Sequence, residues 1–254
     1  MPKIVYLDNL PAQEGVSILE NQNKIEVVKI ESNNLEQSFK ELETAHAFQV
    51  SAARDEVPKI FHVNEEFLSK TPNLILVSSG GAGYDTIDVE ACTKRGILVV
   101  NQTGGNAEAV AEHAVALMLD LLKRVTETDL LLRKGWSGAR EDFIGRNLFK
   151  KTVGLIGLGN TGGRVAEICQ NGFSCDILAY DPYISNERFS KLNAKKINLD
   201  ELLFESDIVS VHIPLTKETH NFIDKNFYSK MKKGSLYYYN LSLIHISEPT
   251  RLRS

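Results

Sequence analysis

Three glycines stand at a spacing that suits the binding of a phosphate-rich ligand. The segment "TVGLIGLGNTGG" places Gly157, Gly159 and Gly162 in the pattern G-x-G-x-x-G, directly after an apolar run and directly before a helical one. In such a turn the first glycine permits a tight bend, the second lets the main chain approach a pyrophosphate, and the third lets helix and strand pack closely. Helix-start amides would then face the phosphates. The pattern predicts a dinucleotide site, and a plain strand-ending turn is the alternative.

An acidic residue further along the chain supports the dinucleotide interpretation. Asp181 ends the apolar run "DILAYD", 19 residues after Gly162, where a carboxylate can accept hydrogen bonds from the adenosine ribose hydroxyls. The same carboxylate would repel a 2'-phosphate, and the "PY" that follows it supplies no arginine. The sequence therefore predicts NAD rather than NADP. Arg188, further downstream, is interpreted as a solvated helix residue.

Alternating apolar and polar segments predict the elements that position these residues. Short runs rich in branched residues alternate with amphipathic stretches up to residue 100 and again from residue 152. This alternation is typical of parallel sheets with crossover helices, so we expect an α/β fold with two lobes. The expected strands are "KIVYL", "IEVVKI", "AFQV", "LILVS", "ILVV", "TVGLIG", "CDILAYD", "DIVSVHI" and "SLYYYN".

A long helix is predicted over residues 106–125, after the turn "NQTGG". Asn106 is suited to cap its start. Its apolar residues near helical spacing are Val110, Ala114, Leu117, Leu121 and Leu122. The turn before the helix marks a boundary between lobes, so we expect domains at 1–102 and 103–240.

Composition narrows the class of partner. The 254 residues carry a formal net charge of -4, with 43% hydrophobic and 24% charged residues, which is an ordinary globular balance. This charge gives no reason to expect nucleic acid or an anionic membrane as a partner. The three cysteines lie outside any metal-type spacing, and neither a signal peptide nor a transmembrane run is apparent. A cytoplasmic protein that acts on small molecules, without a metal site, is expected.

At this point the sequence resembles the D-isomer-specific 2-hydroxyacid dehydrogenases. The resemblance runs from about Leu74 to Asn240 and includes "SSGGAGYDTIDVEACTKRGILVVNQTGGNAEAVAEHAVALML", "GLIGLGNTGG", "AYDPYIS", "SDIVSVHIPLTKETHNFID" and "MKKGSLYYYN". It implies a flavodoxin-like substrate lobe and a Rossmann NAD-binding lobe, both incomplete at the C-terminus. It also implies hydride transfer between NAD and a D-2-hydroxyacid or 2-oxoacid bound between the lobes. The long helix matches the element through which the family forms homodimers.

The resemblance assigns roles to individual positions. Gly80, Gly81, Ala82 and Gly83 match the turn whose amides hold the substrate carboxylate, and Ala82 also approaches the nicotinamide side of the cofactor; a plain strand-to-helix turn is the alternative. The cofactor-binding positions that match are Gly157, Gly159, Asn160, Thr161, Gly162, Asp181, His212, Ile213 and Pro214. His212 is expected to be structural rather than a proton carrier. His113 is expected to pack in the core.

No catalytic residue is assigned within the chain. Hydride transfer needs a cation for the carboxylate, a general acid/base at the hydroxyl, and a carboxylate that tunes this base. The family supplies an arginine three residues after the asparagine that matches Asn240, then a glutamate and a histidine, whereas this chain has Leu243 at that position. We therefore expect these 254 residues to be inactive and the parent protein to be the enzyme.

The last residues raise a separate expectation. The segment "LSLIHISEPTR", residues 241–251, resembles the translation of a transposon-end adapter used to prepare sequencing libraries. Residues 241–254 are therefore expected to be a non-native tail. A natural tail on a catalytically dead binding protein is the alternative.

Two functions stay open at this stage. The first is an NAD-dependent oxidoreductase, most like the phosphoglycerate dehydrogenases within the family, with glyoxylate, lactate or another 2-hydroxyacid as alternative substrates. The second is a non-enzymatic NAD-binding regulatory protein of the same fold. Oxidation of NADH with 2-oxoacids discriminates between them.

Overall fold

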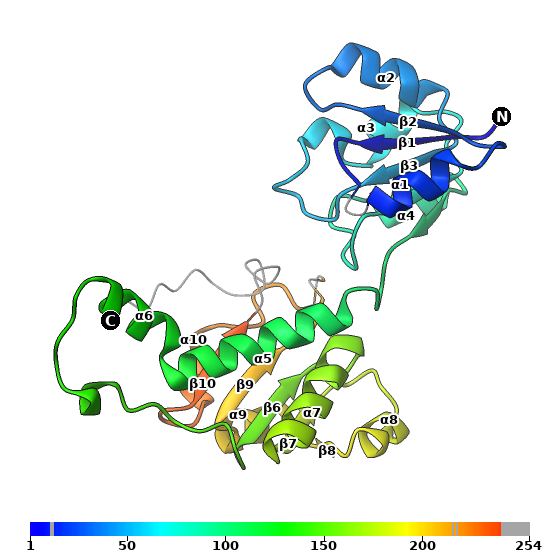
Figure 1. Cartoon of the computed structure of the whole chain (residues 1–254). Coiled ribbons are helices and arrows are strands. Elements are labelled where there is room, and N and C mark those ends of the chain that lie inside the picture. Colours follow the sequence, from blue (N-terminus) through cyan, green and yellow to red (C-terminus); the bar gives the residue numbers. More distant parts are fainter. Residues whose placement is uncertain (11–12, 215, 217, 240–254) are drawn as a thin grey trace. The chain divides into compact units, whose positions relative to one another are not determined.

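The computed structural model of the chain describes residues 1–10, 13–214, 216 and 218–239 (Figure 1). These residues form two compact units, of which the first is Met1–Asn106 and the second begins at Ala107. The division lies four residues beyond the boundary expected after residue 102. Each unit has its own parallel sheet, so each is described separately.

The first unit contains a sheet in which every pairing is parallel. Its strands run in the order β2-β1-β3-β4-β5, which is the flavodoxin-like order. The strands are β1 (Lys3–Leu7), β2 (Glu26–Ile30), β3 (Ala47–Val50), β4 (Leu76–Ser79) and β5 (Leu98–Val100). All five were predicted as apolar runs, and the expected architecture of this lobe is confirmed.

Helices and one 3₁₀ turn connect the strands of the first unit. They are α1 (Gln13–Glu20), α2 (Leu35–Glu43), η1 (Lys59–Phe61), α3 (Glu65–Ser69) and α4 (Val89–Lys94). Asn34, Asn64 and Asp88 cap three of the helices because their side-chain oxygens accept hydrogen bonds from first-turn amides. The core is aromatic at its centre, where the rings of Phe48 and Phe67 stack with centroids 5.2 Å apart.

The second unit contains a parallel sheet in the order β10-β9-β6-β7-β8. Counted from β6 as the first strand, this is the Rossmann order 5-4-1-2-3, with the topological switch between β6 and β9. The strands are β6 (Thr152–Ile156), β7 (Asp176–Tyr180), β8 (Lys195–Lys196), β9 (Ile208–Val211) and β10 (Leu236–Tyr239). The Rossmann prediction is confirmed. The two-residue strand β8 was not predicted because both of its residues are exposed lysines.

Helices cover both faces of this second sheet. The helices of this unit are α5 (Ala107–Lys123), α6 (Val125–Arg133), α7 (Asn160–Phe173), α8 (Asn186–Lys191), α9 (Leu199–Glu205) and α10 (Lys225–Lys230), with a 3₁₀ turn η2 (Arg140–Phe143). Of these, α6 and η2 have no buried residue and do not cover the sheet. Leu155 packs with α5 and α7 on one face, and its neighbour Ile156 packs with α9 and α10 on the other. Figure 1 shows α5 and α7 lying alongside each other over the strands. Burial on both faces explains why the strands are continuous apolar runs.

The buried face of α5 contains only some of the apolar residues noted near helical spacing. Its buried residues are Ala111, Ala114, Val115, Met118 and Leu122. Ala114 and Leu122 were noted near helical spacing, whereas Leu121, noted with them, is 47% exposed. Alanines on the buried face allow α5 to approach α7 closely, and Glu108 pairs with Arg164 of α7 at 2.7 Å. Helical spacing alone does not distinguish a small-residue contact face from a neighbouring row of leucines.

Two classes of feature are missing from the described part of the chain. None of its helices combines the length and the apolar character that a membrane span requires. Nowhere in residues 1–10, 13–214, 216 and 218–239 do three histidine, cysteine, aspartate or glutamate side chains gather as metal ligands would. Cys92, Cys169 and Cys175 are free and buried.

Candidate functional site

Two of the three motif glycines are required by packing within the turn itself. Gly157 has a φ of +91°, and a Cβ there would lie 2.6 Å from the carbonyl oxygen of His212. A Cβ on Gly162 would lie 2.1 Å from the carbonyl oxygen of Gly157. Any side chain at these positions would therefore displace backbone, so the strand β6, the turn and the helix α7 are held in close contact.

The middle glycine has a different environment. A Cβ built on Gly159 would meet no heavy atom within 4 Å, so this side of the turn is open. Asn160 and Thr161 form the first turn of α7, a helix of 14 residues. The amides of a first helical turn lack intrahelical partners and suit an anion. An open glycine beside such amides fits the pyrophosphate of a dinucleotide.

Asp181 is fixed against the glycine turn. It follows β7 directly, and its Oδ2 accepts a hydrogen bond from the Leu158 amide at 2.9 Å. Its Oδ1 accepts another from the Tyr183 amide at 3.0 Å. Asp181 also lines an open hollow of about 440 Å³ that continues past Pro182 and Lys196 toward α9. The carboxylate predicted to bind the ribose is therefore oriented beside the turn, with space next to it.

Arg188 is a residue whose place in the site the sequence analysis missed. Its Nη2 donates to the Gly159 carbonyl oxygen at 3.1 Å, and its Nε donates to the Leu158 carbonyl oxygen at 3.5 Å. Arg188 lies on a helix, as expected, but it is half-buried rather than fully solvated, because the start of α8 folds back onto the glycine turn. No spacing rule identifies it, since it contacts residues 29 and 30 positions earlier in the chain.

A second pair missed from the sequence joins two loops at the same edge of the sheet. The hydroxyl of Tyr183, in the loop after β7, donates a hydrogen bond to the carboxylate of Glu218, in the loop after β9. This contact raises the pKa of the Tyr183 hydroxyl, chiefly because Glu218 accepts its proton in a hydrogen bond. The two loops that flank the strand β6 are thereby tied to each other.

His212 packs on the glycine turn as a neutral side chain. Its carbonyl oxygen is the atom that a Cβ on Gly157 would strike, and its Nε2 lies 2.8 Å from the hydroxyl of Ser210. Burial of the imidazole lowers the pKa of His212 to about 4. The side chain of Ile213 also contacts this turn, since its Cγ2 would lie 3.0 Å from a Cβ on Gly157. Pro214 is exposed.

One histidine departs from its expected place. His113 on α5 is exposed, although core packing was predicted for it. It lies outside the buried face of α5.

The turn from Gly80 to Gly83 lies in the first unit, after β4. The amide of Gly80 donates to the Val50 carbonyl oxygen at 2.8 Å, so this amide is already bonded. The carbonyl oxygens of Gly81, Ala82 and Gly83 accept hydrogen bonds from the Gln102 amide (3.0 Å), the Asn101 side chain (2.8 Å) and the Ser79 hydroxyl (2.5 Å). The amides of Gly81, Ala82 and Gly83 donate to no acceptor among the described residues, so they are the groups of this turn that can meet a carboxylate.

The structure thus brings most of the predicted cofactor residues together within the second unit. Gly157, Gly159, Asn160, Thr161, Gly162, Asp181, His212 and Ile213 all lie at the carboxyl ends of β6, β7 and β9. This edge, beside the switch between β6 and β9, is where open α/β sheets bind ligands. Asn240, Leu243 and the predicted tail at 241–254 lie outside the described residues.

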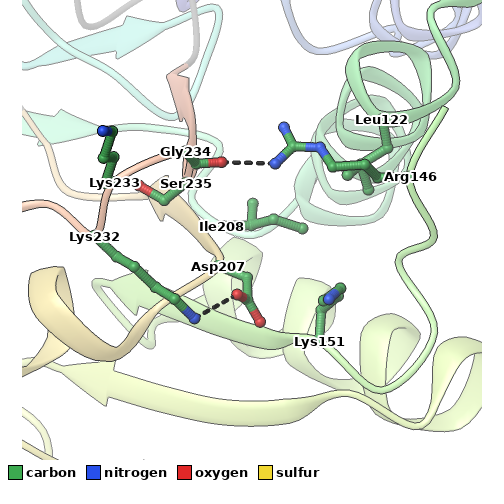
Figure 2. Close-up of a pocket in the computed structure, with 9 residues that line it drawn as sticks. All are labelled: Leu122, Arg146, Lys151, Asp207, Ile208, Lys232, Lys233, Gly234 and Ser235. Carbon is green, nitrogen blue, oxygen red and sulfur yellow. Dashed lines mark hydrogen bonds and ion pairs between the residues drawn. The ribbon is translucent and has the colours of Figure 1, made fainter. Parts of the chain in front are cut away.

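A cationic pocket lies at the opposite edge of the same sheet, where β9 and β10 begin. Figure 2 shows Arg146 bonded to the Gly234 carbonyl oxygen and Lys232 paired with Asp207. The pocket, of about 200 Å³, is also lined by Lys151 and contains none of the predicted site residues. Ligands of parallel sheets bind at the carboxyl ends of the strands, so this pocket is not the candidate site.

Comparison with known proteins agrees with this geometry. A family model described as "D-isomer specific 2-hydroxyacid dehydrogenase, NAD binding domain" matches residues 115–242. The chain is 42% identical over 173 residues to a D-3-phosphoglycerate dehydrogenase of Archaeoglobus fulgidus, covering 68% of this chain and 32% of that protein. It is 35% identical over 180 residues to a glyoxylate reductase of Thermococcus litoralis, covering 68% of this chain and 54% of that protein.

A solved structure with the same fold is similar over most of the chain. The D-lactate dehydrogenase of Aquifex aeolicus, complexed with NAD and lactic acid, aligns with a TM-score of 0.78 and 31% identity over 93% of this chain and 68% of that one. The chain spans about a third of the length of its phosphoglycerate dehydrogenase relative from Archaeoglobus fulgidus. The glycine turn, the locked Asp181 and these matches lead to one conclusion. The chain belongs to the D-isomer specific 2-hydroxyacid dehydrogenase family, and its second unit is the NAD-binding domain of that family.

Proposed function

We propose that this chain carries the cofactor-binding half of an NAD-dependent D-2-hydroxyacid dehydrogenase. The observation that carries the proposal is the pairing of the open Gly159 with a carboxylate, Asp181, locked to the adjacent amide of Leu158. Bound NAD supplies hydride transfer at its nicotinamide. The residues of this chain hold the pyrophosphate at Asn160 and Thr161, accept the ribose hydroxyls at Asp181, and pack the turn with neutral His212.

Binding of NADH by the 254-residue chain tests this proposal. Titration followed by the fluorescence of the reduced nicotinamide should give saturable binding, with NADH tighter than NADPH because Asp181 repels a 2'-phosphate. Asp181→Ala should weaken NADH binding by about tenfold, since hydrogen bonds to a charged group are worth about 1.5–3 kcal/mol. Absence of NADH binding by folded protein would overturn the proposal.

Turnover is proposed for the parent protein rather than for these 254 residues. The position matched to the family's carboxylate-binding arginine is Leu243, and the glutamate and histidine that tune proton transfer have no match here. We expect the chain to bind NADH but not to oxidise it with phosphohydroxypyruvate, glyoxylate or pyruvate. Steady NADH oxidation by purified chain would contradict this assignment. A parent protein that carries the three groups and still shows no turnover would favour a regulatory NAD-binding role.

The substrate is proposed to be a 2-hydroxyacid, most similar to 3-phosphoglycerate, held by its carboxylate. The support is the turn at Gly81, Ala82 and Gly83, whose carbonyls are bonded and whose amides are available. Amide chemical shifts of ¹⁵N-labelled chain should move at these residues when 3-phosphoglycerate is added. Gly96, an exposed glycine of the same unit at the end of α4, is the internal control. Equal movement at Gly96 would indicate a nonspecific effect.

A homodimer is proposed from the exposed apolar side chains of the second unit. Leu121, Val125, Leu130 and Leu132 on α5 and α6 are 47%, 54%, 51% and 65% exposed. Apolar side chains gathered on adjacent helices are typical of subunit interfaces. Light scattering during size-exclusion chromatography should give the mass of a dimer, and Leu132→Asp should shift it toward the monomer. A wild-type monomer would contradict the proposal.

A cytoplasmic location is proposed from the free, buried cysteines.

A further inference from the structure

We propose that cofactor choice in this protein rests on two opposite charges held on one residue of the glycine turn, and that Arg188 is the specificity-determining cation. Asp181 excludes the 2'-phosphate of NADP, while Arg188 already stands where it could bind this phosphate. Removal of the carboxylate alone should therefore convert the site to NADPH. This inference rests on the proposed NAD site and adds a residue that the family pattern of glycines and acid does not contain.

The backbone of Leu158 bonds to both charged side chains, Asp181 and Arg188. Its amide donates to Asp181 and its carbonyl oxygen accepts from Arg188. The amide nitrogen and carbonyl oxygen of one residue are separated by no more than about 4 Å of covalent path. The carboxylate and the guanidinium thus flank a single residue of the turn, from its two polar ends. A ribose bound by Asp181 would therefore lie at the same residue of the turn that Arg188 contacts.

The positive charge of Arg188 is not matched by a carboxylate among the described residues. Its Nε and Nη2 bond to uncharged carbonyl oxygens of Leu158 and Gly159. Within the described residues it forms no ion pair, and its Nη1 is unused there. An arginine whose planar donors are partly free and whose charge is unmatched is suited to a phosphate. By contrast, Lys196 in the neighbouring hollow donates to the Asn186 side chain at 3.0 Å.

The guanidinium of Arg188 packs against the helix α7 at Gly163. A Cβ on Gly163 would lie 2.7 Å from Nη2 of Arg188, so the guanidinium lies directly against the first turn of α7. The lack of a side chain at Gly163 leaves the space that the guanidinium occupies. Arg188 is therefore held in place before any cofactor binds, and it does not need to be recruited from solvent.

The experiment is a double-variant cycle on the full 254-residue chain, with NADH and NADPH as probes. Asp181→Ser removes the negative charge and leaves room for a phosphate. We expect it to tighten NADPH binding by about tenfold or more, the value of a charge-assisted hydrogen bond, and to weaken NADH binding. In Asp181→Ser combined with Arg188→Met, the gain for NADPH should disappear. The gain should also shrink as the salt concentration rises.

Controls separate this role from a merely structural one. Lys191→Met removes a positive charge from the same helix without touching the turn, and in the Asp181→Ser background it should keep the gain for NADPH. Arg188→Lys should restore part of the gain, because it keeps the charge but not the planar fork. Circular dichroism and thermal melting establish that each variant is folded.

The outcomes distinguish failure of the specificity role of Arg188 from failure of the proposed NAD site. An equal gain for NADPH with and without Arg188 would overturn the specificity role, and so would no gain in a folded Asp181→Ser variant that binds NADH. Failure of the wild-type chain to bind either reduced cofactor would instead overturn the proposed NAD site.

Discussion

Gly159 and Gly162 illustrate how two residues of one motif serve different purposes. A Cβ on Gly159 would enter open space, whereas a Cβ on Gly162 would lie 2.1 Å from a backbone oxygen. Gly159 therefore leaves space beside the turn, and Gly162 allows the turn and the helix to pack closely. The motif already predicts this difference, because its second glycine is expected to admit a pyrophosphate and its third to let helix and strand pack closely.

This difference gives a prediction for two matched alanine variants. Gly162→Ala should lower the free energy of unfolding by about 1–3 kcal/mol because its Cβ forces backbone movement. Gly159→Ala should keep its free energy of unfolding within about 1 kcal/mol of the wild-type value. It should lose affinity for NADH, since its methyl group would occupy the open side of the turn, where the pyrophosphate is proposed to bind. Urea denaturation and NADH titration measure the two effects. Loss of stability in Gly159→Ala, with binding retained, would contradict the assignment.

His212 gives a prediction about pH. Because its pKa is lowered to about 4 by burial, the unfolded chain, with a pKa near the ordinary histidine value of about 6.5, binds a proton that the folded chain does not. The free energy of unfolding should therefore fall as the pH falls from about 6.5 toward 4, and this loss is absent above that range. Denaturation at a series of pH values measures it.

The control for this prediction is His212→Gln, which keeps a polar partner for Ser210 but cannot titrate. Its stability should depend less steeply on pH over the same range. A midpoint near 6.5 for the His212 ring protons in NMR titration of the folded chain would show that the imidazole is not shielded as described.

At the residue scale, sequence reasoning identified the groups that sit at fixed offsets. The three glycines and Asp181 follow a spacing imposed by one strand, one turn and the next strand. Arg188 and the pair formed by Tyr183 and Glu218 follow no such offset. They meet because loops after different strands end at one edge of the sheet, which becomes apparent only when the strand order is known.

At the scale of elements, the contact between β6 and α9 depends on another glycine. A Cβ on Gly154 would lie 2.2 Å from the Ser206 hydroxyl oxygen and 2.7 Å from Cδ2 of Leu202. Leu202 is fully buried, and the Ser206 hydroxyl donates to its carbonyl oxygen at 2.6 Å. The helix therefore lies as close to the strand as a backbone without a side chain allows.

Gly154→Ala should consequently lower the free energy of unfolding by about 1–3 kcal/mol, as expected when a methyl group is forced into a filled core. The matched control is Gly172→Ala in α7, where a Cβ would meet nothing within 4 Å. That variant should gain about 0.5–1 kcal/mol, because alanine is favoured over glycine inside a helix. Parallel thermal and urea denaturation compares the two. Equal stability of both variants would show that α9 can move away without cost.

The elements themselves were largely predictable, and the exceptions have physical causes. Of the ten strands in the described part of the chain, nine are short apolar runs and were therefore expected. The strand β8 has only two exposed residues and carries no such signal. The full buried face of α5 was not apparent from the sequence because it includes Ala111, and small side chains contribute little to an apolar pattern.

At the scale of the whole molecule, each unit holds a separate hydrophobic core. The core of the first unit is drawn entirely from residues between Val5 and Ile97. Its five strands are all contributed by the first 106 residues. A domain of this size can bury enough apolar surface to fold alone.

Residues 1–106, produced without the rest of the chain, should therefore melt cooperatively. Circular dichroism should show both helical and strand signals, and amide exchange should be slowest in β1, β3 and β4, the three inner strands. A broad, non-cooperative melt would indicate that this unit needs the remainder of the chain for its stability.

The position of β6 has a consequence for folding of the chain during its synthesis on the ribosome. This strand is the first of its sheet to be synthesised, yet it lies in the middle, and its Val153 pairs with Ile208 only after 55 more residues have been added. At about 5–20 residues per second, translation leaves one flank of β6 bare for about 3–11 s. During that interval the nascent chain exposes an apolar strand with one unpaired edge, which is a surface that a ribosome-associated chaperone can bind.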